Sequence, residues 1–332
     1  MKNKVITLNK RPVGKPTLEN FGFLEEEMPK AGPGEVLLKT KYISVDPYLR
    51  GRMNDTKSYI PSFQLNKPIQ SGIIAEVIES GNKLFPKGSF VSGILDWKEY
   101  QTSTGNGLMP VDPDIAPLSA YLGILGMTGL TAYLGLMEIG KPKTGETLFV
   151  SGAAGAVGSV VGQIGKILEC RVVGIAGTDE KIALLKDKFG FDEALNYKTT
   201  HELKKAIAAA CPDGIDVYFD NVGGEISDDV MASMNRLGRV VVCGAISLYN
   251  ETEIPMGPRV QPMLVTKSIL MQGFIVSNYS DKFLTALQQL STWLKEGKLV
   301  YEETVVEGFD KIPEAFIGLF EGRNEGKMIV KI

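Results

Sequence analysis

A glycine-rich segment at residues 152–158 holds the residues of this chain best suited to chemistry. Gly152, Gly155 and Gly158 follow an apolar stretch at 147–151 and precede a second one at 160–168, and a third apolar stretch lies at 171–176. Strand, glycine turn, helix and strand within about 30 residues are typical of a dinucleotide-binding βαβ unit. The glycines permit a tight turn, close approach of a pyrophosphate and close packing of helix on strand, and the helix N-terminus offers N–H groups to phosphate. The alternative is a glycine-rich turn without a ligand.

The residues after the second strand of this unit predict which dinucleotide binds. NAD sites usually end that strand with Asp or Glu, which bonds the ribose hydroxyls. Gly177 and Thr178 stand there instead, and small residues leave room for a 2′-phosphate. Lys181 follows one helical turn later and can supply the opposing charge, while Thr178 can donate a hydrogen bond. Asp179 favours NAD mildly unless it caps the helix. We therefore expect NADP(H), with NAD(H) as the alternative.

The metal-ligating and nucleophilic residue types are few. The chain has three cysteines, Cys170, Cys211 and Cys243, and one histidine, His201. They are too far apart for the usual zinc-ligand spacing, so we expect no metal site. His201 lies in a polar segment and is predicted at the surface, which disfavours a histidine base or a Ser-His-Asp triad. Cys243 ends a predicted buried strand and is expected to pack there rather than act as a nucleophile.

Composition excludes several other classes of protein. A length of 332 residues suggests about two domains, and 44% hydrophobic residues predict an ordinary globular core. The net charge of −3 gives no reason to expect nucleic acid or an anionic membrane as partner. No apolar stretch of about 18 residues lacks interruption, so no membrane span is expected. The first ten residues lack the apolar region of a signal peptide, which makes the cytoplasm the expected location.

Two kinds of segment must position these residues. Residues 36–43, 72–79 and 88–93 are β-rich runs between Gly and Pro turns, which predicts a small, mostly antiparallel barrel over 1–125. An apolar helical segment spans 118–136. Further on, predicted strands alternate with helices, which indicates an α/β, doubly wound parallel sheet of about six strands. Strands are expected at 147–151, 171–176, 193–196, 215–220, 239–243 and 269–274, and helices at 160–168, 179–189, 201–210, 225–235 and 281–296. The tail at 300–332 is expected to return to the first domain as β-type segments, so the domains are 1–125 with 298–332, and 126–297.

Ligands of such sheets lie beyond the carboxyl ends of the strands, at the switch point. That rule selects three more loops, at residues 220–224, 244–250 and 275–278. Their Asn and Gly residues suit hydrogen bonds to a nicotinamide ribose and carboxamide. The alternative is that they are ordinary turn residues.

Six segments resemble the zinc-independent branch of the medium-chain dehydrogenases/reductases that holds leukotriene B4 12-hydroxydehydrogenase/prostaglandin reductase and the alkenal double-bond reductases. They lie at residues 45–50, 126–133, 153–159, 220–224, 246–250 and 326–330, in the family's order and over nearly the whole chain. The resemblance implies a GroES-like catalytic domain, a Rossmann domain, a homodimer and NADPH as reductant. Zinc-dependent relatives carry Gly-His-Glu near the start of the barrel, whereas residues 70–76 here contain neither His nor Cys.

The resemblance also implies residue roles. Tyr59 is similar to a substrate-side tyrosine of the branch, and Lys181 and Tyr197 would reach the adenosine 2′-phosphate. With the positions argued above, the expected cofactor-binding set is Gly152, Ala153, Ala154, Gly155, Ala156, Val157, Gly158, Gly177, Thr178, Lys181, Tyr197, Asn221, Cys243, Gly244, Ala245, Ile246, Ser247, Tyr249, Phe274, Ile275, Val276 and Asn324.

The expected reaction is reduction of the carbon–carbon double bond of an α,β-unsaturated ketone or aldehyde, with hydride transfer to the β-carbon. Charge then develops on the carbonyl oxygen, which needs a positioned hydrogen-bond donor in the absence of a metal. Tyr249 is the first candidate donor, alone or with the ribose 2′-hydroxyl, and Tyr59 is the second. Quinone reduction and a non-catalytic NADPH-binding role remain the alternatives.

Overall fold

The computed structural model describes residues 2–332. Backbone contacts divide the chain into two compact units. Unit 1 consists of the residues up to Leu122, together with Glu303–Asn324 and Met328–Ile332, and unit 2 consists of Gly123–Glu302 and Glu325–Lys327. Because the last third of the chain contributes to both units, neither is a single continuous segment.

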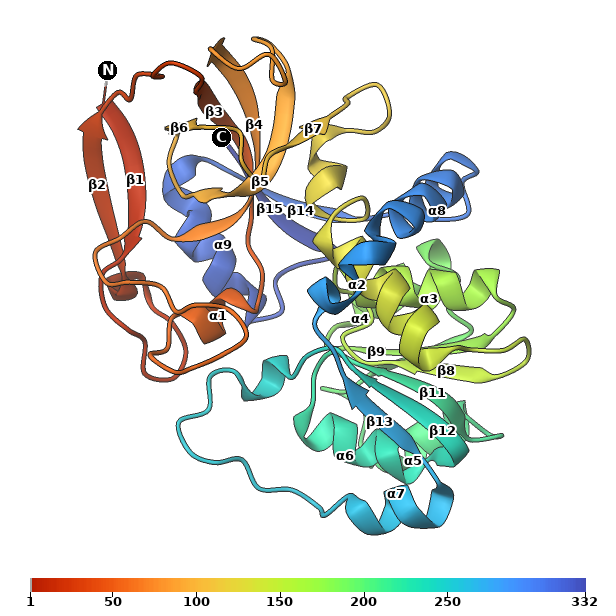
Figure 1. The fold of residues 1–332 in the computed structure, drawn as a ribbon. Coiled ribbons are helices and arrows are strands. Elements are labelled where there is room, and N and C mark those ends of the chain that lie inside the picture. The colour runs from red at the N-terminus through yellow and green to blue at the C-terminus, as the bar shows by residue number, and fades with distance from the viewer. Residues whose placement is uncertain (1) are drawn as a thin grey trace. The chain divides into compact units, whose positions relative to one another are not determined.

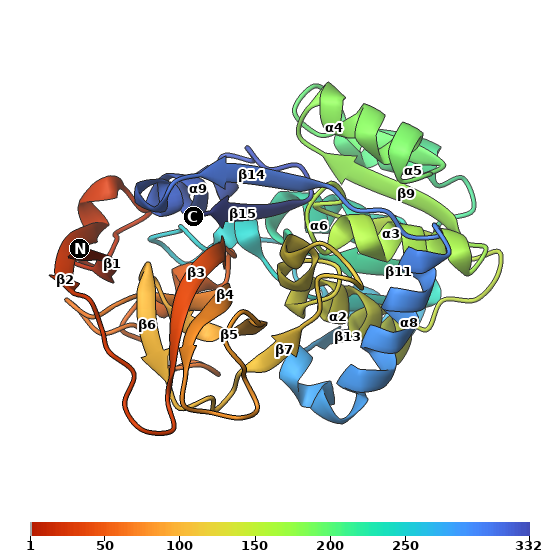
Figure 2. The ribbon, with the colours of Figure 1, turned by 90° about the horizontal axis from the view of Figure 1, so that it is seen from above.

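Unit 1 is built mostly on antiparallel strands. A seven-stranded sheet has the order β14-β15-β3-β4-β5-β7, with β6 paired to β3, and β1 and β2 form a separate two-stranded sheet. The strands are β1 (Lys2–Leu8), β2 (Phe21–Glu27), β3 (Val36–Ser44), β4 (Gln70–Ser80), β5 (Phe90–Asp96), β6 (Tyr100–Ser103), β7 (Met109–Val111), β14 (Glu303–Glu307) and β15 (Lys327–Lys331). β15, at the C-terminus, pairs antiparallel with β3 and so brings the end of the chain into the sheet of the N-terminal half (Figure 2).

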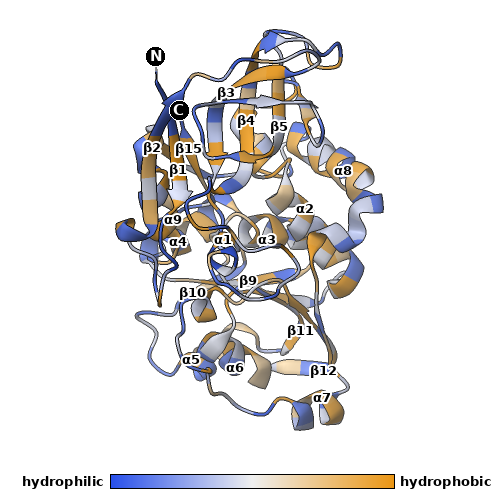
Figure 3. Cartoon of the chain, turned by 60° about the vertical axis from the view of Figure 1, so that its left-hand side comes forward, coloured by the Kyte–Doolittle hydropathy of each residue, from blue (hydrophilic) through white to orange (hydrophobic). Residues whose placement is uncertain are grey.

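The core of unit 1 explains this arrangement. Five of the eleven residues of β4 are buried and only the last two are exposed, and the strand is drawn largely in the hydrophobic colour in Figure 3. Trp97 is fully buried, stacks on Phe21, and donates its indole N–H to the Ser71 hydroxyl at 2.8 Å. The short helix α1 (Leu49–Arg52) and helix α9 (Ile312–Leu319) add further buried apolar residues to the same cluster.

Unit 2 contains one six-stranded sheet in the order β10-β9-β8-β11-β12-β13, and every neighbouring pair is parallel (Figure 1). The strands are β8 (Thr147–Val150), β9 (Arg171–Ala176), β10 (Glu193–Asn196), β11 (Ile215–Asp220), β12 (Met234–Val242) and β13 (Leu270–Gly273). β9 and β10 extend the sheet from β8 to one side, whereas β11, β12 and β13 extend it to the other side, so the strand order reverses between β8 and β11. That pair is therefore the switch point at which such sheets bind ligands.

Helices cover both faces of this sheet, because its central strands β8, β9 and β11 are apolar on both faces and buried. Phe149, Val173 and Tyr218 pack with residues of α5 and α6, whereas Gly165 of α3 lies against Leu148 on the opposite face. Figure 1 shows α2 and α3 on one side and α5 and α6 on the other. The helices are α2 (Met127–Leu134), α3 (Gly158–Ile167), α4 (Asp179–Ala183), α5 (Leu203–Ala210), α6 (Gly224–Ala232), α7 (Gln261–Lys267) and α8 (Phe283–Lys295). None of the helices within residues 2–332 is long and apolar enough to cross a bilayer.

The predicted fold class is confirmed, but the continuous helix expected at 118–136 is wrong. The segment contains a 3₁₀ turn at Leu118–Leu122, then α2, then a π-helical turn at Gly135–Gly140. Residues 123–126 fold against α2, where a Cβ on Gly129 would lie 1.9 Å from the Ile124 carbonyl oxygen. The tight packing at Gly129 explains the break.

Three other boundaries differ from expectation. The helix expected at 225–235 ends at Ala232, because Met234 already pairs with Ile215 at the start of β12. Helix α5 begins at Leu203 rather than at position 201, after Glu202 in the left-handed region. The tail holds α9 as well as strands, and its buried residues Ile312, Phe316 and Leu319 have the four- and three-residue spacing of a helix.

Candidate active site

The glycine turn after β8 has the geometry that its sequence predicts. Gly152 has φ of +58°, a left-handed conformation that favours glycine. A Cβ on Gly158 would lie 2.4 Å from the Gly152 carbonyl oxygen, so α3 can approach the turn only without a side chain there. A Cβ on Gly155 would meet only the Gly152 carbonyl oxygen, at 3.2 Å, which leaves its other side open. The turn therefore fits a pyrophosphate at the N-terminus of α3.

Gly326 supports this turn from the far end of the chain. Its N–H donates to the Ala154 carbonyl at 2.8 Å, and the two segments form a parallel bridge between Gly155 and Gly326. A side chain at Gly326 is excluded, since a Cβ would lie 1.9 Å from the Glu302 carbonyl oxygen. The sequence showed Gly326 only as part of a family motif and did not place it under the glycine turn.

The loops after β8 and β11 are joined across the switch point. Asn221 donates its backbone N–H to the Ser151 hydroxyl at 2.9 Å and its side-chain amide to the Ser151 carbonyl at 2.7 Å. The Ile246 N–H donates to the Asn221 carbonyl at 3.3 Å, which adds the loop after β12. The structure thus brings the glycine turn, Asn221 and residues 243–249 together on one edge of the sheet.

The predicted 2′-phosphate site lies at the end of β9. Thr178, rather than Asp179, is the N-cap of α4, and its hydroxyl accepts from the Lys181 N–H at 3.3 Å. Asp179 instead accepts a hydrogen bond from the Asn196 side chain. Tyr197 lies over Gly177, because a Cβ there would be 2.9 Å from the Tyr197 hydroxyl. The Tyr197 hydroxyl therefore borders the space that was expected beside Gly177. This hydroxyl can itself donate a hydrogen bond to a phosphate.

Lys181 is half-buried at this end of the sheet. Burial lowers the pKa of its ammonium group, with a smaller contribution from the positive charge of Lys198, while Glu325 opposes the shift. A buried ammonium group gains most from an anionic partner. Lys198 is an exposed second cation that the sequence analysis did not select, although its position two residues after the last residue of β10 was a usable signal.

Tyr249 is half-buried at the end of the loop after β12. Its hydroxyl oxygen accepts from the Ala245 N–H at 3.3 Å, and a Cβ on Gly244 would approach it to 3.1 Å. Burial raises the pKa of the phenol, and the Ala245 hydrogen bond opposes that shift. The backbone contact orients the oxygen and leaves the hydroxyl proton available to a further acceptor.

The side chain of Phe274 packs in the interior of unit 2. Its ring is buried against Gly135 and lies 6.3 Å from the ring of Tyr279, centroid to centroid. Any contact of Phe274 with a ligand therefore comes from its backbone, which continues into Ile275 and Val276 after β13. These two residues stand at the same carboxyl edge as the other loops.

Two predicted site residues, Asn324 and Tyr59, belong to unit 1. Tyr59 is 61% exposed on the irregular segment 54–66. Arg52 anchors that segment, since its guanidinium lies 4.0 Å from the centre of the Phe63 ring and its Nε donates to the Pro61 carbonyl at 3.0 Å. Arg52 is itself buried and was not selected from the sequence.

None of the three thiols is activated. Burial raises the pKa of Cys170 to about 11 and that of Cys211 and Cys243 to about 12. Cys243 follows β12 directly and is intermediate in exposure, whereas Cys170 and Cys211 are buried. His201 is exposed, as expected. Within residues 2–332, no three His, Cys, Asp or Glu side chains gather as metal ligands.

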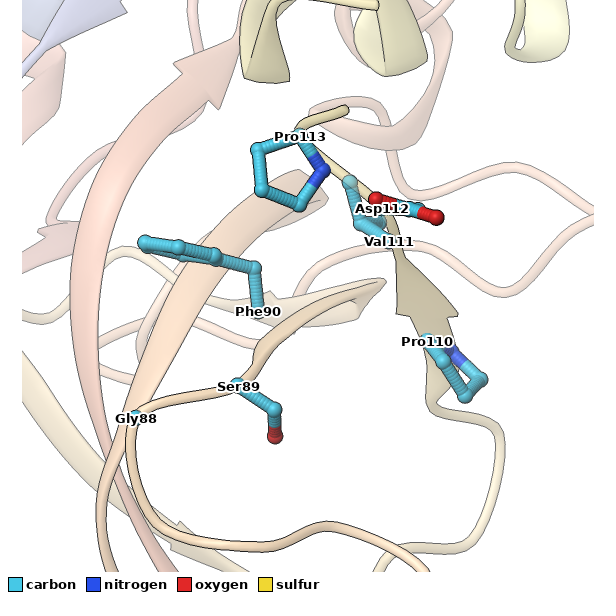
Figure 4. Close-up of a pocket in the computed structure, with 7 residues that line it drawn as sticks. All are labelled: Gly88, Ser89, Phe90, Pro110, Val111, Asp112 and Pro113. Atoms are coloured by element: carbon cyan, nitrogen blue, oxygen red, sulfur yellow. The ribbon is translucent and has the colours of Figure 1, made fainter. Parts of the chain in front are cut away.

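A separate pocket of about 290 Å³ lies in unit 1 between β5 and β7 (Figure 4). Phe90 and Pro113 face it, with Ser89 and Asp112 as its polar side chains. None of the predicted site residues lines it. The pocket is therefore not part of the proposed cofactor site.

The parallel sheet, the glycine turn at its switch point and the cationic end of β9 define a dinucleotide-binding protein of the α/β class. Residues 4–111 match the family described as the N-terminal domain of oxidoreductase, and residues 156–292 match the family described as zinc-binding dehydrogenase. Both descriptions name oxidoreductases, which agrees with the dinucleotide-binding fold.

Individual relatives place the chain more closely. It is 59% identical to a putative NADP-dependent oxidoreductase, YfmJ, of Bacillus subtilis, over 98% of this chain and 97% of that protein. Mouse prostaglandin reductase 1 is 48% identical, over 98% of each chain. A tobacco NADP(+)-dependent 2-alkenal reductase is 47% identical, over 91% of this chain and 88% of the relative. The solved structure of CurA from Vibrio vulnificus in complex with NADPH has a TM-score of 0.93 and 43% identity, over 99% of this chain and 98% of CurA.

The chain belongs to the medium-chain dehydrogenase/reductase family, in the branch of the prostaglandin and alkenal reductases. The predicted family is confirmed.

Proposed function

We propose that this protein reduces the carbon–carbon double bond of α,β-unsaturated ketones and aldehydes with NADPH and without zinc. The observation that carries the proposal is the phenol of Tyr249. It is held by the Ala245 N–H on the nucleotide-binding edge of the sheet, one loop away from Asn221. A neutral hydroxyl fixed there suits the stabilisation of an enolate oxygen.

The relatives confirm the predicted enzyme class and cofactor, because they are named NADP-dependent reductases and one solved relative holds NADPH. The residues of this chain fit that cofactor. Gly155 is open where a pyrophosphate would lie, and Lys181, Thr178 and Tyr197 surround the end of β9. We assign the pyrophosphate to the turn at 152–158 and the 2′-phosphate to Lys181 and Tyr197.

The proposed chemistry follows from these residues. Bound NADPH supplies a hydride to the β-carbon of the conjugated substrate. Electron density then moves to the carbonyl oxygen, and the Tyr249 hydroxyl donates a hydrogen bond to that oxygen as its charge develops. Tyr59 is the second proposed donor and orients the carbonyl. The α-carbon takes its proton from solvent or through one of these hydroxyls.

A substrate panel tests the proposal. Purified protein with NADPH is given an alkenal, an enone, a quinone and a saturated aldehyde, and NADPH consumption and products are measured. We expect turnover of the alkenal and the enone to the saturated carbonyl compound, and none of the saturated aldehyde. Turnover of the quinone without turnover of the alkenal or the enone would support a quinone reductase. NADPH binding without turnover of any compound would support a binding role.

Zinc independence and a cytoplasmic location complete the proposal. The three cysteines and single histidine lack zinc-ligand spacing, and residues 70–76 lack the histidine of zinc-dependent relatives. Elemental analysis of the active enzyme, and its activity after chelator treatment, test the first point. The second is supported by the three cysteines, which are all free thiols, as in proteins of a reducing compartment.

We also propose a homodimer, through the edge strand β13. Among residues 2–332, β13 pairs only with β12, and Leu270 on it is 49% exposed. Val265 on the adjoining α7 is 78% exposed. An exposed apolar edge strand is a template for pairing, and a second copy of the same strand satisfies it symmetrically.

A further inference from the structure

Asp220, the last residue of β11, is only 3% exposed and carries a dense set of hydrogen bonds. One carboxylate oxygen, Oδ1, accepts from the Ser151 hydroxyl at 2.9 Å and from the Tyr218 hydroxyl at 2.8 Å. The same oxygen accepts from the N–H groups of Val222 at 3.0 Å and Gly223 at 2.9 Å. An anionic oxygen suits several donors at once, whereas a neutral amide oxygen binds them less strongly.

These bonds hold a loop that would otherwise be free to change shape. Gly223 and Gly224 have φ of +67° and +60°, two consecutive left-handed residues with no side chains to restrict them. The Asp220 carboxylate restrains this segment by accepting hydrogen bonds from the N–H groups of Val222 and Gly223. The Ser247 hydroxyl donates to the Val222 carbonyl at 2.6 Å, which adds a second restraint on the same segment.

Asp220 also reaches the loop after β12 through its backbone. Its carbonyl oxygen accepts from the Cys243 N–H at 2.8 Å and from the Gly244 N–H at 3.1 Å. The next residue, Ala245, donates its N–H to the Tyr249 hydroxyl at 3.3 Å. The Asp220 carboxylate reaches the same loop through Val222, because Val222 donates its N–H to Oδ1 and its carbonyl accepts from both the hydroxyl and the N–H of Ser247.

We propose that Asp220 is a positioning residue that pre-organises both loops, placing Asn221 for the nicotinamide half of NADPH and Tyr249 for the substrate carbonyl. The Tyr249 part of this inference rests on the proposed function, and the Asn221 part rests only on NADPH binding. A loop held in shape before the ligand arrives binds it without a further ordering cost.

The test is Asp220→Asn, which keeps the shape and removes the charge. Its matched control is Asp216→Asn on the same strand. Asp216 also accepts two hydrogen bonds, from the Thr147 N–H and the Asn235 side chain, but at the amino end of β11. For D220N we expect the Kd for NADPH to rise about tenfold and kcat at saturating NADPH to fall about tenfold. Amides 222–223 and 243–249 of the cofactor-free variant should exchange hydrogen faster.

D216N should lower the thermal unfolding midpoint while its Kd for NADPH stays within about twofold of the parent. If D220N lowers only that midpoint and leaves NADPH binding, kcat and loop exchange unchanged, Asp220 is merely structural and the inference is wrong. If Tyr249→Phe leaves enone turnover intact, the proposed function loses its donor. The Asp220 inference then stands or falls on NADPH binding and loop exchange alone.

Tyr218→Phe covers the case in which D220N does not fold. It removes the hydroxyl that donates to Asp220 at 2.8 Å, together with its side-chain hydrogen bonds with Ser151 and Ser227, and keeps the buried ring. We expect a Kd for NADPH about two- to threefold higher and faster exchange confined to the same two loops. Unchanged exchange in both loops would contradict the inference.

Discussion

Tyr249 shows how a common side chain acquires a particular role from its backbone. Its oxygen is oriented by one N–H group, and burial keeps its proton bound well into the alkaline range because the pKa of the phenol is raised. The phenol therefore stays protonated at neutral pH and can donate a hydrogen bond to a developing negative charge.

Replacing Tyr249 by Phe should therefore reduce kcat for an enone by ~10²-fold or more, because a single donor to a developing oxyanion contributes that much. The Kd for NADPH should rise by a much smaller factor, because Tyr249 is only one of many residues expected to bind the cofactor. Steady-state kinetics with an alkenal, and NADPH titration by fluorescence, measure both quantities. Tyr133→Phe is the control, since Tyr133 is also half-buried with a raised pKa but lies on α2 beside Trp293. Equal kcat values for the two variants would reject Tyr249 as the donor.

Lys181 gives a prediction about pH. Burial lowers the pKa of its free ammonium group below the ordinary value of 10.5. Below that lowered pKa the group is charged and attracts the 2′-phosphate, and above it the attraction is lost. The Kd for NADPH should therefore rise as the pH passes this lowered pKa, at lower pH than for an ordinary lysine, while the Kd for NADH stays flat.

Lys181→Ala should remove this pH dependence and most of the preference for NADPH over NADH. The matched control is Lys186→Ala, because Lys186 follows on the next turn and pairs at the surface with Glu193. Calorimetric titration of both nucleotides gives the four affinities. An unchanged preference in the Lys181 variant would remove this residue from the 2′-phosphate site.

At the scale of elements, the turn between β8 and α3 couples stability to ligand binding. Gly158→Ala places a Cβ where the structure has 2.4 Å to a carbonyl oxygen, so α3 must move away from the turn. We expect a loss of ~3 kcal/mol in the free energy of unfolding, together with weaker NADPH binding. Denaturant unfolding measures the first. Gly51→Ala is the control, with no atom within 4 Å of the added Cβ, and should be neutral within ~1 kcal/mol.

Strand and helix alternation predicted the parallel sheet closely, because buried parallel strands are continuous apolar runs with clear ends. The limits of β10 and β11 match the predicted residues. The start of β12 at Met234 was not predictable, since it depends on pairing with Ile215 and on the Asn235 side chain bridging to Asp216. Local propensity favoured continuing the helix there.

The candidate site was predictable where the signal is a residue type on a loop, and not where it is a partner under the loop. Gly152, Lys181 and Asn221 follow from position after a strand. Asp220 was visible only as the first residue of a motif, and its bonds to Ser151 and Tyr218 depend on the folded sheet. Gly326 lies far away in sequence, so its contact with Ala154 required the structure.

At the scale of the whole molecule, the exposed edge of β13 predicts assembly. Leu270→Lys should convert a dimer into a monomer, because a charge on the edge strand opposes its pairing with a second copy. Light scattering coupled to gel filtration gives the mass. Leu284→Lys changes a residue on α8 that is 70% exposed and should leave the dimer intact. A parent protein that is already monomeric would overturn the proposed interface.

The buried thiols have a consequence for a reductase of conjugated carbonyls. Such compounds are electrophiles that alkylate cysteine through its thiolate form. With a pKa of about 11 for Cys170 and about 12 for Cys211 and Cys243, only about one thiol in 10⁴ or fewer is ionised near pH 7. We therefore expect these three thiols to react slowly with the enzyme's own electrophilic substrates.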